Sequence, residues 1–242
     1  MLTPIDLRRE VLRRYGAEQV IEVPFDRELS RKTPEQFVRD VLVGDIGAGV
    51  VVVGENFRFG HKAAGDFGDL RRLMREMGGE AVAVEVREIG EEAGISSTRI
   101  RALIAEGRVE EAAELLGRAY VLRGEVVVGD RRGRTIGFPT ANVLPEEEAV
   151  VPAYGVYAGF VLVGDHRLAA CTNVGVAPTF ARAESRVEAY LLDFEGDLYG
   201  RVVDVGFTRR IRGEIKFSGI DELKAQIQRD VETARSLVGE GS

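Results

Sequence analysis

The hydrophobic pattern changes at Gly117, and this change constrains the fold more than any other feature of the sequence. Before Gly117, apolar runs of strand length alternate with stretches of helical periodicity. Such alternation is typical of a parallel α/β sheet. After Gly117, short alternating runs are separated by Gly and Asp turns, which favours an antiparallel sheet closed into a barrel. The sequence therefore predicts an α/β domain over 1–117 and a β domain over 118–242.

Individual elements follow from the same periodicities. Thr33, Pro34 and Gln36 form a capping-box pattern typical of a helix start. The first half is expected to contain helices at 4–15, 33–42, 66–77 and, broken near Gly107, 97–116, with strands at 19–25, 49–53 and 80–89. The second half is expected to contain strands at 120–129, 155–164, 168–176, 186–194 and 201–211, followed by an amphipathic helix at 221–238.

Composition narrows the class of protein. The net charge is -7 over 242 residues, and no basic stripe is present, which argues against nucleic acid as the main partner and favours a small-molecule ligand. Cys171 is the single cysteine, so no internal disulfide can form, and we expect it to fill space in the core. Because no apolar run approaches the roughly 20 residues of a membrane helix, we expect no membrane association and a cytoplasmic location.

The run GDRRGRTIGFPTAN, at 129–142, holds the first candidate site. A backbone can approach phosphate closely only where side chains are small, and Gly129, Gly133 and Gly137 meet that need. Thr140 and Asn142 then supply a hydroxyl and an amide oxygen, hard ligands suited to Mg²⁺ on nucleotide phosphates. The alternative is a glycine-rich turn that joins two strands.

A second candidate is Glu188, within the predicted strand RVEAYLLDF. If this carboxylate faces the same cavity as the Thr-Asn pair, it can accept the proton of an attacking hydroxyl group. The alternative is a solvent-facing glutamate on an edge strand.

The first half carries weaker signals. Asn56 lies in GENFRFG, directly after a predicted strand, where open α/β sheets bind ligands. Ser97, Thr98 and Arg101 lie at a predicted helix start, which favours a bound anion such as a nucleotide phosphate. The alternative is an ordinary helix cap with solvated arginines.

The ordered set GENFRFG, ISSTRIR, LGRAYVLRGEVVVG, GRTIGFPTAN, NVGVAPTF, VEAYLLDF, DLYG and IRGEIKF resembles the prokaryotic bifunctional riboflavin kinase/FAD synthetase family over the whole chain. The resemblance implies a Rossmann-like nucleotidyltransferase domain followed by a Greek-key β-barrel with a C-terminal helix. It also implies ATP-dependent phosphorylation of riboflavin to FMN. Thr140 and Asn142 would hold Mg²⁺ and ATP phosphates, Glu188 would be the catalytic base, and Arg134 joins the nucleotide-binding residues.

The adenylyltransferase half departs from the family pattern. The resemblance implies an HxGH-type motif after an early strand, and these 242 residues contain none. We therefore expect an incomplete first domain in which FMN adenylylation to FAD is impaired or lost. One alternative is a complete bifunctional enzyme whose true start lies upstream of Met1. Another is a flavin-binding regulatory module without catalysis.

Overall fold

The computed structural model describes residues 1–85, 95–129, 132–176 and 185–239. The chain forms two compact units, one of residues Gln19–Gly94 and one that joins Met1–Glu18 to Ile95–Ser242. These units do not follow the predicted division at Gly117, because the helices between 97 and 116 pack on the barrel. The division into functional modules at 1–117 and 118–242 stays a prediction.

The unit Gln19–Gly94 contains a short parallel sheet, in which β1 and β2 pair from Val50↔Glu80 to Gly54↔Val84. The helix predicted at 33–42 is confirmed, and its capping box is complete because Thr33 and Gln36 exchange hydrogen bonds. The elements of this unit are η1 (Leu29–Arg31), α2 (Pro34–Gln36), η2 (Phe37–Asp45), β1 (Val50–Gly54), η3 (His61–Ala63), α3 (Phe67–Glu76) and β2 (Glu80–Val84).

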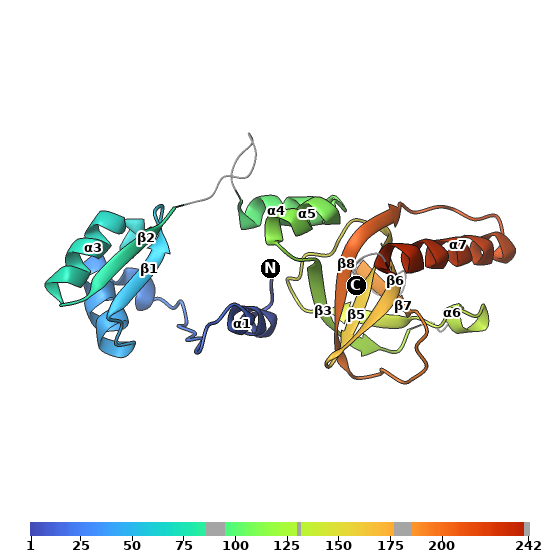
Figure 1. Cartoon of the computed structure of the whole chain (residues 1–242), viewed down its shortest axis with the longest axis horizontal. Helices are drawn as coiled ribbons and strands as arrows, with labels where there is room; N and C mark the ends of the chain where they lie inside the picture. Colours follow the sequence, from blue (N-terminus) through green and yellow to red (C-terminus); the bar gives the residue numbers. More distant parts are fainter. Residues whose placement is uncertain (86–94, 130–131, 177–184, 240–242) are drawn as a thin grey trace. The chain divides into compact units, whose positions relative to one another are not determined.

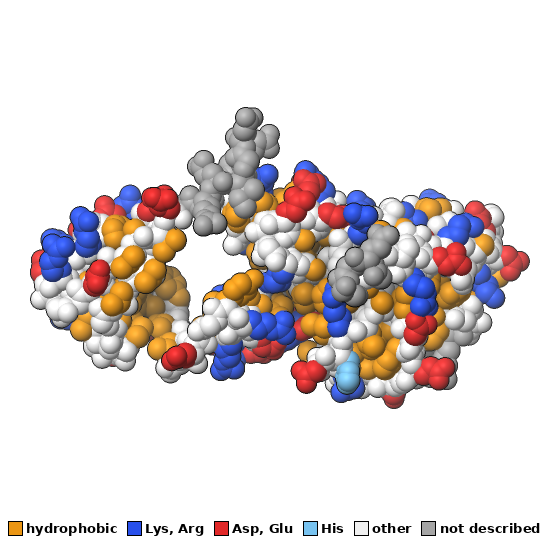
Figure 2. All heavy atoms as spheres, viewed as in Figure 1, with side chains coloured by type: hydrophobic (Ala, Val, Ile, Leu, Met, Phe, Trp, Pro, Cys, Tyr) orange, Lys and Arg blue, Asp and Glu red, His pale blue; other side chains and the backbone are white. Residues whose placement is uncertain are grey.

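Within the described residues of this unit, one face of the β1–β2 sheet is covered and the other is exposed. Leu70, Leu73 and Met74 of α3 form a buried cluster with Val38 of η2 and Ala81 of β2. On the opposite face, hydrophobic side chains gather over the two strands in Figure 2. The exposed valines of these strands are Val50, Val52, Val82 and Val84.

The prediction of a strand at 19–25 is wrong. Residues 19–25 take no regular structure, and none of the described strands pairs with them. Pro24 interrupts the run and has no N–H to donate to a neighbouring strand. Phe25 is 82% exposed, so the run buries too little apolar surface to hold it in a sheet.

The second unit is built around a closed barrel with the strand order β3-β4-β7-β6-β5-β8. All five strands predicted after Gly117 are present, and β4, which sequence reasoning missed, completes the closure. The barrel strands are β3 (Tyr120–Val127), β4 (Ala141–Pro145), β5 (Gly155–Val163), β6 (His166–Val176), β7 (Ser185–Leu191) and β8 (Val202–Arg212). The helices are α1 (Ile5–Arg14), α4 (Ser97–Ala105), α5 (Val109–Leu116), α6 (Arg132–Thr135) and α7 (Ile220–Gly239).

Helices cover the barrel from two directions. Ile104 of α4 and Val109 of α5 are fully buried in the cluster that also fills the barrel interior. On the outer wall, Val231 and Ala234 of α7 pack against Ala158 of β5, and α7 runs beside the strands in Figure 1. The fold predicted for the second half, an antiparallel barrel with a C-terminal helix, is confirmed.

An ion network ties α1 to the barrel wall. Arg123 of β3 makes a two-pronged pair with Asp204 of β8, at 2.6 and 2.8 Å, and also contacts Glu10 of α1 at 2.9 and 3.0 Å. The side chains of Arg123 and Asp204 are only 13% and 10% exposed. Their mutual hydrogen bonds offset the cost of burying two charges.

Candidate active site

Three neighbouring barrel strands bring the strongest predicted site residues to one face. Asn142 of β4 is the register partner of Glu188 of β7, and Glu188 is also the register partner of Asn173 of β6. Register partners in an antiparallel sheet project from the same face, with Cβ atoms about 4.5–5.5 Å apart. The chain thus places the amide of Asn142 and the carboxylate of Glu188 side by side.

Strand alternation explains this placement. Val187, Ala189 and Leu191 of β7 belong to the buried core of the barrel, so Glu188 and Tyr190 between them face outward. Because β7 pairs with a strand on both sides, Glu188 does not lie on an edge strand. Its side chain is 25% exposed, which rules out the alternative of a fully solvated glutamate.

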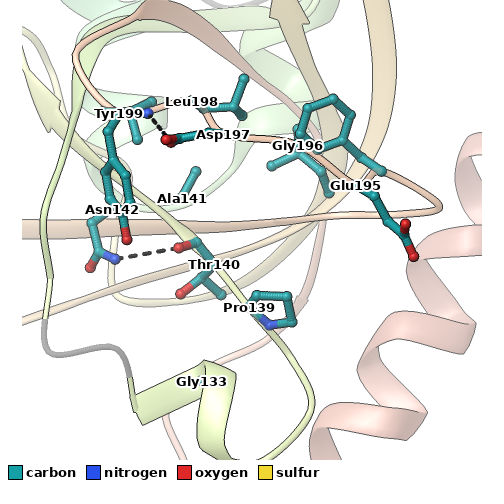
Figure 3. Close-up of a pocket in the computed structure, with 13 residues that line it drawn as sticks. Gly133, Pro139, Thr140, Ala141, Asn142, Glu195, Gly196, Asp197, Leu198 and Tyr199 are labelled. Carbon is teal, nitrogen blue, oxygen red and sulfur yellow. Dashed lines mark hydrogen bonds between the residues drawn. The ribbon is translucent and has the colours of Figure 1, made fainter.

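Asn142 is held on two sides. Its Oδ1 accepts hydrogen bonds from Nε and Nη2 of Arg186, at 2.9 and 2.7 Å. Its Nδ2 donates to the carbonyl oxygen of Thr140 at 3.5 Å, as drawn in Figure 3. Nη2 of Arg186 also lies 3.0 Å from Oε1 of Glu188. One guanidinium therefore joins the predicted metal ligand to the predicted base.

The glycines of the 129–142 run have internal reasons to be glycines. A Cβ at Gly129 would lie 2.4 Å from Cγ of Asn142, and a Cβ at Gly133 would lie 2.3 Å from the carbonyl oxygen of Phe138. Gly137 has a φ of +91°, which favours glycine. A role of these residues in phosphate binding stays a prediction. The side chain of Arg134, in α6, lies outside the described residues.

Thr140 and Asn142 line a cavity of about 430 Å³ (Figure 3). The opposite wall is the segment 194–199, in which Oδ1 of Asp197 accepts a hydrogen bond from the backbone N–H of Tyr199 at 2.9 Å. The lining combines carboxylates, a hydroxyl group and aromatic rings. Such a wall can hold a ligand that has both polar and flat parts.

A second cavity, of about 480 Å³, lies between the barrel wall and α7. Glu188 and Asn173 contribute polar groups, and Phe138 and Tyr190 contribute rings whose centroids lie 5.6 Å apart. The two cavities share Gly133 and Thr140 among their lining residues. They are therefore neighbours, with Asn142 lining one and Glu188 lining the other.

An ion pair fixes α7 against the second cavity. Arg212 of β8 and Asp230 of α7 make hydrogen bonds of 2.6 to 3.1 Å, and Gln226 donates to Asp230 at 2.8 Å. Arg212 thus pairs with an acid on the helix rather than with the nearby Glu214. Cys171 also lines this cavity, and burial raises the pKa of its thiol to about 12. The thiol therefore stays protonated and serves as a space-filling group, as predicted.

The weaker candidates fall in separate units. Asn56, after β1, is exposed and belongs to the unit Gln19–Gly94. Ser97 and Thr98 lie in the exposed first turn of α4, in the barrel unit, and Ser96 is the N-cap. Arg101 donates a hydrogen bond to Thr98 Oγ1 at 3.0 Å. A nucleotide-binding role for these four predicted residues stays a prediction.

The donor set fits a magnesium ion that arrives with a nucleotide. Thr140 and Asn142 offer hard oxygen atoms, and Mg²⁺ usually keeps water molecules and phosphate oxygens beside one or two protein ligands. Among the described residues, no cluster of three or more His, Cys, Asp or Glu side chains could hold a metal by itself. The residues present therefore suit a metal shared with phosphates.

Two features of the site escaped sequence reasoning. Arg186 stands two residues before Glu188, so its position on the same face of β7 was available from the strand period. Asn173 lies in NVGVAPTF, where the glycines and proline drew attention to the loop instead. The register that sets Asn173 beside Glu188 carries no local signal in the sequence.

Comparisons with known proteins identify the family. The family model for riboflavin kinase matches residues 116–238, and the model for FAD synthetase matches residues 1–99. The bifunctional riboflavin kinase/FMN adenylyltransferase of Escherichia coli strain K12 is 40% identical over 239 residues, which cover 98% of this chain and 76% of that protein. This chain belongs to the bifunctional riboflavin kinase/FMN adenylyltransferase family.

Another relative agrees with this assignment, and a solved structure shares the fold. The bifunctional riboflavin kinase/FMN adenylyltransferase of Bacillus subtilis strain 168 is 34% identical over 238 residues, which cover 97% of this chain and 74% of that protein. A crystal structure described as a macrolide-efflux protein from Streptococcus pneumoniae superposes with a TM-score of 0.87 at 35% identity, over 97% of this chain and 75% of that one. That description concerns the matched protein. In the part of this chain that the structure describes, no helix is both long and apolar enough to cross a membrane.

Family membership confirms the resemblance and the enzyme class. The riboflavin kinase match contains Thr140, Asn142 and Glu188, together with both cavities. The FAD synthetase match contains Asn56 and Ser97 and ends before Arg101. Riboflavin, FMN and ATP are the small molecules that suit the riboflavin kinase/FMN adenylyltransferase family.

Proposed function

We propose that the barrel unit transfers the γ-phosphoryl group of ATP to the 5′-hydroxyl group of riboflavin, which gives FMN and ADP. The observation that carries this proposal is that two neighbouring cavities share Gly133 and Thr140 in their walls. Asn142 lines one cavity, Glu188 lines the other, and the two are register partners. A phosphate in the first cavity and a hydroxyl group in the second would face each other there.

The lining of each cavity favours one substrate. The larger cavity has aromatic and aliphatic walls from Phe138, Tyr190, Phe217 and Ile227, which suit the flat, mainly apolar ring system of riboflavin. The smaller cavity has the carboxylates Glu195 and Asp197, which can accept hydrogen bonds from ribose hydroxyl groups. It also contains Thr140 and Asn142. We therefore assign ATP to the smaller cavity.

The residues have distinct roles in the transfer. The riboflavin 5′-oxygen forms a bond to the γ-phosphorus, the bond between that phosphorus and the bridging oxygen breaks, and the hydroxyl proton passes to the Glu188 carboxylate. Thr140 and Asn142 orient the phosphates through their oxygen atoms. Bound Mg²⁺ would neutralise charge on the phosphates. The rigid barrel contributes by keeping donor and acceptor in line.

We infer further that these 242 residues form FAD only in trace amounts. Their two histidines, His61 and His166, are far apart in sequence and form no HxGH motif. The exposed valine face of the β1–β2 sheet also supports the inference, because parallel sheets are ordinarily covered on both faces. A nucleotide-binding role of Asn56 in one unit, and of Ser97, Thr98 and Arg101 in the other, stays a proposal.

The test is a product assay. The 242-residue chain is incubated with riboflavin, ATP and Mg²⁺, and chromatography separates FMN from FAD. We expect FMN, with FAD at trace level. In Glu188→Gln the turnover is expected to fall by about 10² to 10⁴, the usual contribution of a general base. The matched control is Glu125→Gln, the same change at an exposed position of β3, where turnover stays unchanged.

Each remaining outcome identifies an alternative. Robust FAD formation by the chain would support a complete bifunctional enzyme and refute the inference about FAD. Riboflavin or FMN binding without phosphate transfer would support a regulatory flavin-binding module and refute the kinase proposal. Normal turnover in Glu188→Gln would remove this residue from the mechanism.

A further inference from the structure

Arg186 occupies the position between the two groups that the proposed function uses. It lies on β7 two residues before Glu188, so the two side chains leave the same face of the strand. Its Nε and Nη2 donate to Oδ1 of Asn142 at 2.9 and 2.7 Å, and Nη2 lies 3.0 Å from Oε1 of Glu188. The Arg186 side chain is 21% exposed, so these contacts form in a partly desolvated place where charge interactions are strong.

These contacts exclude a metal ion from Asn142. An amide oxygen has two lone pairs, and the two N–H groups of Arg186 use both of them. A magnesium ion needs that oxygen at about 2.0–2.1 Å. The ion would also repel the guanidinium, since both are positive. Metal binding at Asn142 therefore requires the hydrogen bonds from Arg186 to the amide oxygen to break.

We propose that the guanidinium of Arg186 competes with the divalent metal for Oδ1 of Asn142. It also keeps Glu188 ion-paired until the metal-bound nucleotide binds. The inference rests on the proposed function, which gives Asn142 and Glu188 their roles. In the nucleotide-free protein, the guanidinium keeps both groups paired and oriented. When the metal binds Oδ1 of Asn142, it displaces the Arg186 guanidinium, and the ion pair between Arg186 and Glu188 weakens as a result. Arg186 is thus a positioning residue that links metal loading to release of the base.

The first test uses the metal alone as probe. Binding of Mn²⁺ to the nucleotide-free 242-residue chain is measured by electron paramagnetic resonance. In Arg186→Gln the affinity is expected to rise by about tenfold, the scale on which neighbours of metal ligands change metal affinity. Arg186→Lys keeps the charge but lacks the planar fork, so its affinity should lie between those of the other two. Unchanged Mn²⁺ affinity in Arg186→Gln would overturn the proposal.

Two further variants locate the effect. In Arg186→Gln/Asn142→Ala the gain in Mn²⁺ affinity should disappear, because the freed ligand is gone. A gain that persists would place the metal elsewhere and overturn the proposal. Arg209→Gln is the control for a lost positive charge, because this exposed arginine of β8 pairs with Glu110, away from both cavities, and Mn²⁺ affinity should not change.

Turnover separates this inference from the proposed function. The Mg²⁺ concentration that gives half-maximal FMN formation should fall in Arg186→Gln together with the change in Mn²⁺ affinity. If the unmodified chain makes no FMN, the proposed function fails whatever the Mn²⁺ titration shows. If it makes FMN, and Arg186→Gln leaves both metal measurements unchanged, only the role of Arg186 fails. Thermal melting of each variant shows whether the fold is retained, and Arg186→Lys supplies the test if Arg186→Gln does not fold.

Discussion

Gly129→Ala should impair the kinase without unfolding the barrel. The new Cβ would lie 2.4 Å from Cγ and Oδ1 of Asn142, whereas ordinary contacts between carbon atoms are about 3.5–4.0 Å. The amide must therefore retreat by about 1 Å, and a misplacement of this size can cost about 10²-fold in rate. That loss corresponds to about 2.7 kcal/mol in transition-state stabilisation. The backbone at Gly129 has no positive φ, so alanine itself is not strained there.

The assay for Gly129→Ala is steady-state FMN formation at saturating ATP and Mg²⁺, with urea unfolding measured in parallel. We expect kcat/KM to fall about 10²-fold while stability falls by about 1–3 kcal/mol, the usual cost of overpacking. The control is Gly219→Ala, where the added Cβ meets nothing within 4 Å and φ is not positive. A Gly129→Ala protein that folds and keeps kcat/KM within about twofold would refute the argument that Asn142 must hold its position.

Three further predictions concern ion pairs of the barrel unit. Asp204→Ala removes the more buried partner of Arg123 and leaves it with Glu10, whose side chain is 48% exposed, so the free energy of unfolding should fall by about 1.5–3 kcal/mol. A loss below about 0.5 kcal/mol in urea unfolding would show that the pair is not structural. Asp230→Asn removes the charge that pairs with Arg212, so amide hydrogen exchange in α7 should become about tenfold faster. Unchanged exchange would mean that apolar contacts alone hold the helix against the barrel. The hydrogen bond from Arg123 lowers the pKa of Glu10 below its ordinary value of 4.5, so its contribution is present above that value and is lost as the pH falls through the lowered pKa. Glu10→Gln should therefore cost about 0.2–1 kcal/mol at pH 7 and nothing at pH 2; an equal loss at both would contradict the ionic origin.

The strand and helix periods of the sequence predicted much of the secondary structure of the barrel unit. The run 186–194 predicted a strand that contains Glu188, although its alternation is imperfect. The structure buries Val187, Ala189 and Leu191 on one face of that strand. The amphipathic pattern of 221–238 predicted α7, and the buried and half-buried side chains between 223 and 238 recur at helical spacing. Local chemistry also specified caps, as in the capping box at Thr33.

Local patterns failed where pairing partners decide the outcome. The run 19–25 has the composition of a strand, but a strand forms only where a neighbour accepts its hydrogen bonds. Sequence reasoning missed β4 because this strand has only five residues and follows a glycine-rich run. Its place between β3 and β7 depends on barrel closure, which no single segment encodes.

Periodicity and short motifs were enough to predict the two kinds of sheet, the family and the residue types of the candidate site. The pairing of Asn142 with Glu188, the contacts of Arg186 with both and the two neighbouring cavities became visible only in the folded barrel. Positions 142 and 188 are 46 residues apart in sequence, and strand register, which the packing of the whole barrel fixes, brings their side chains together.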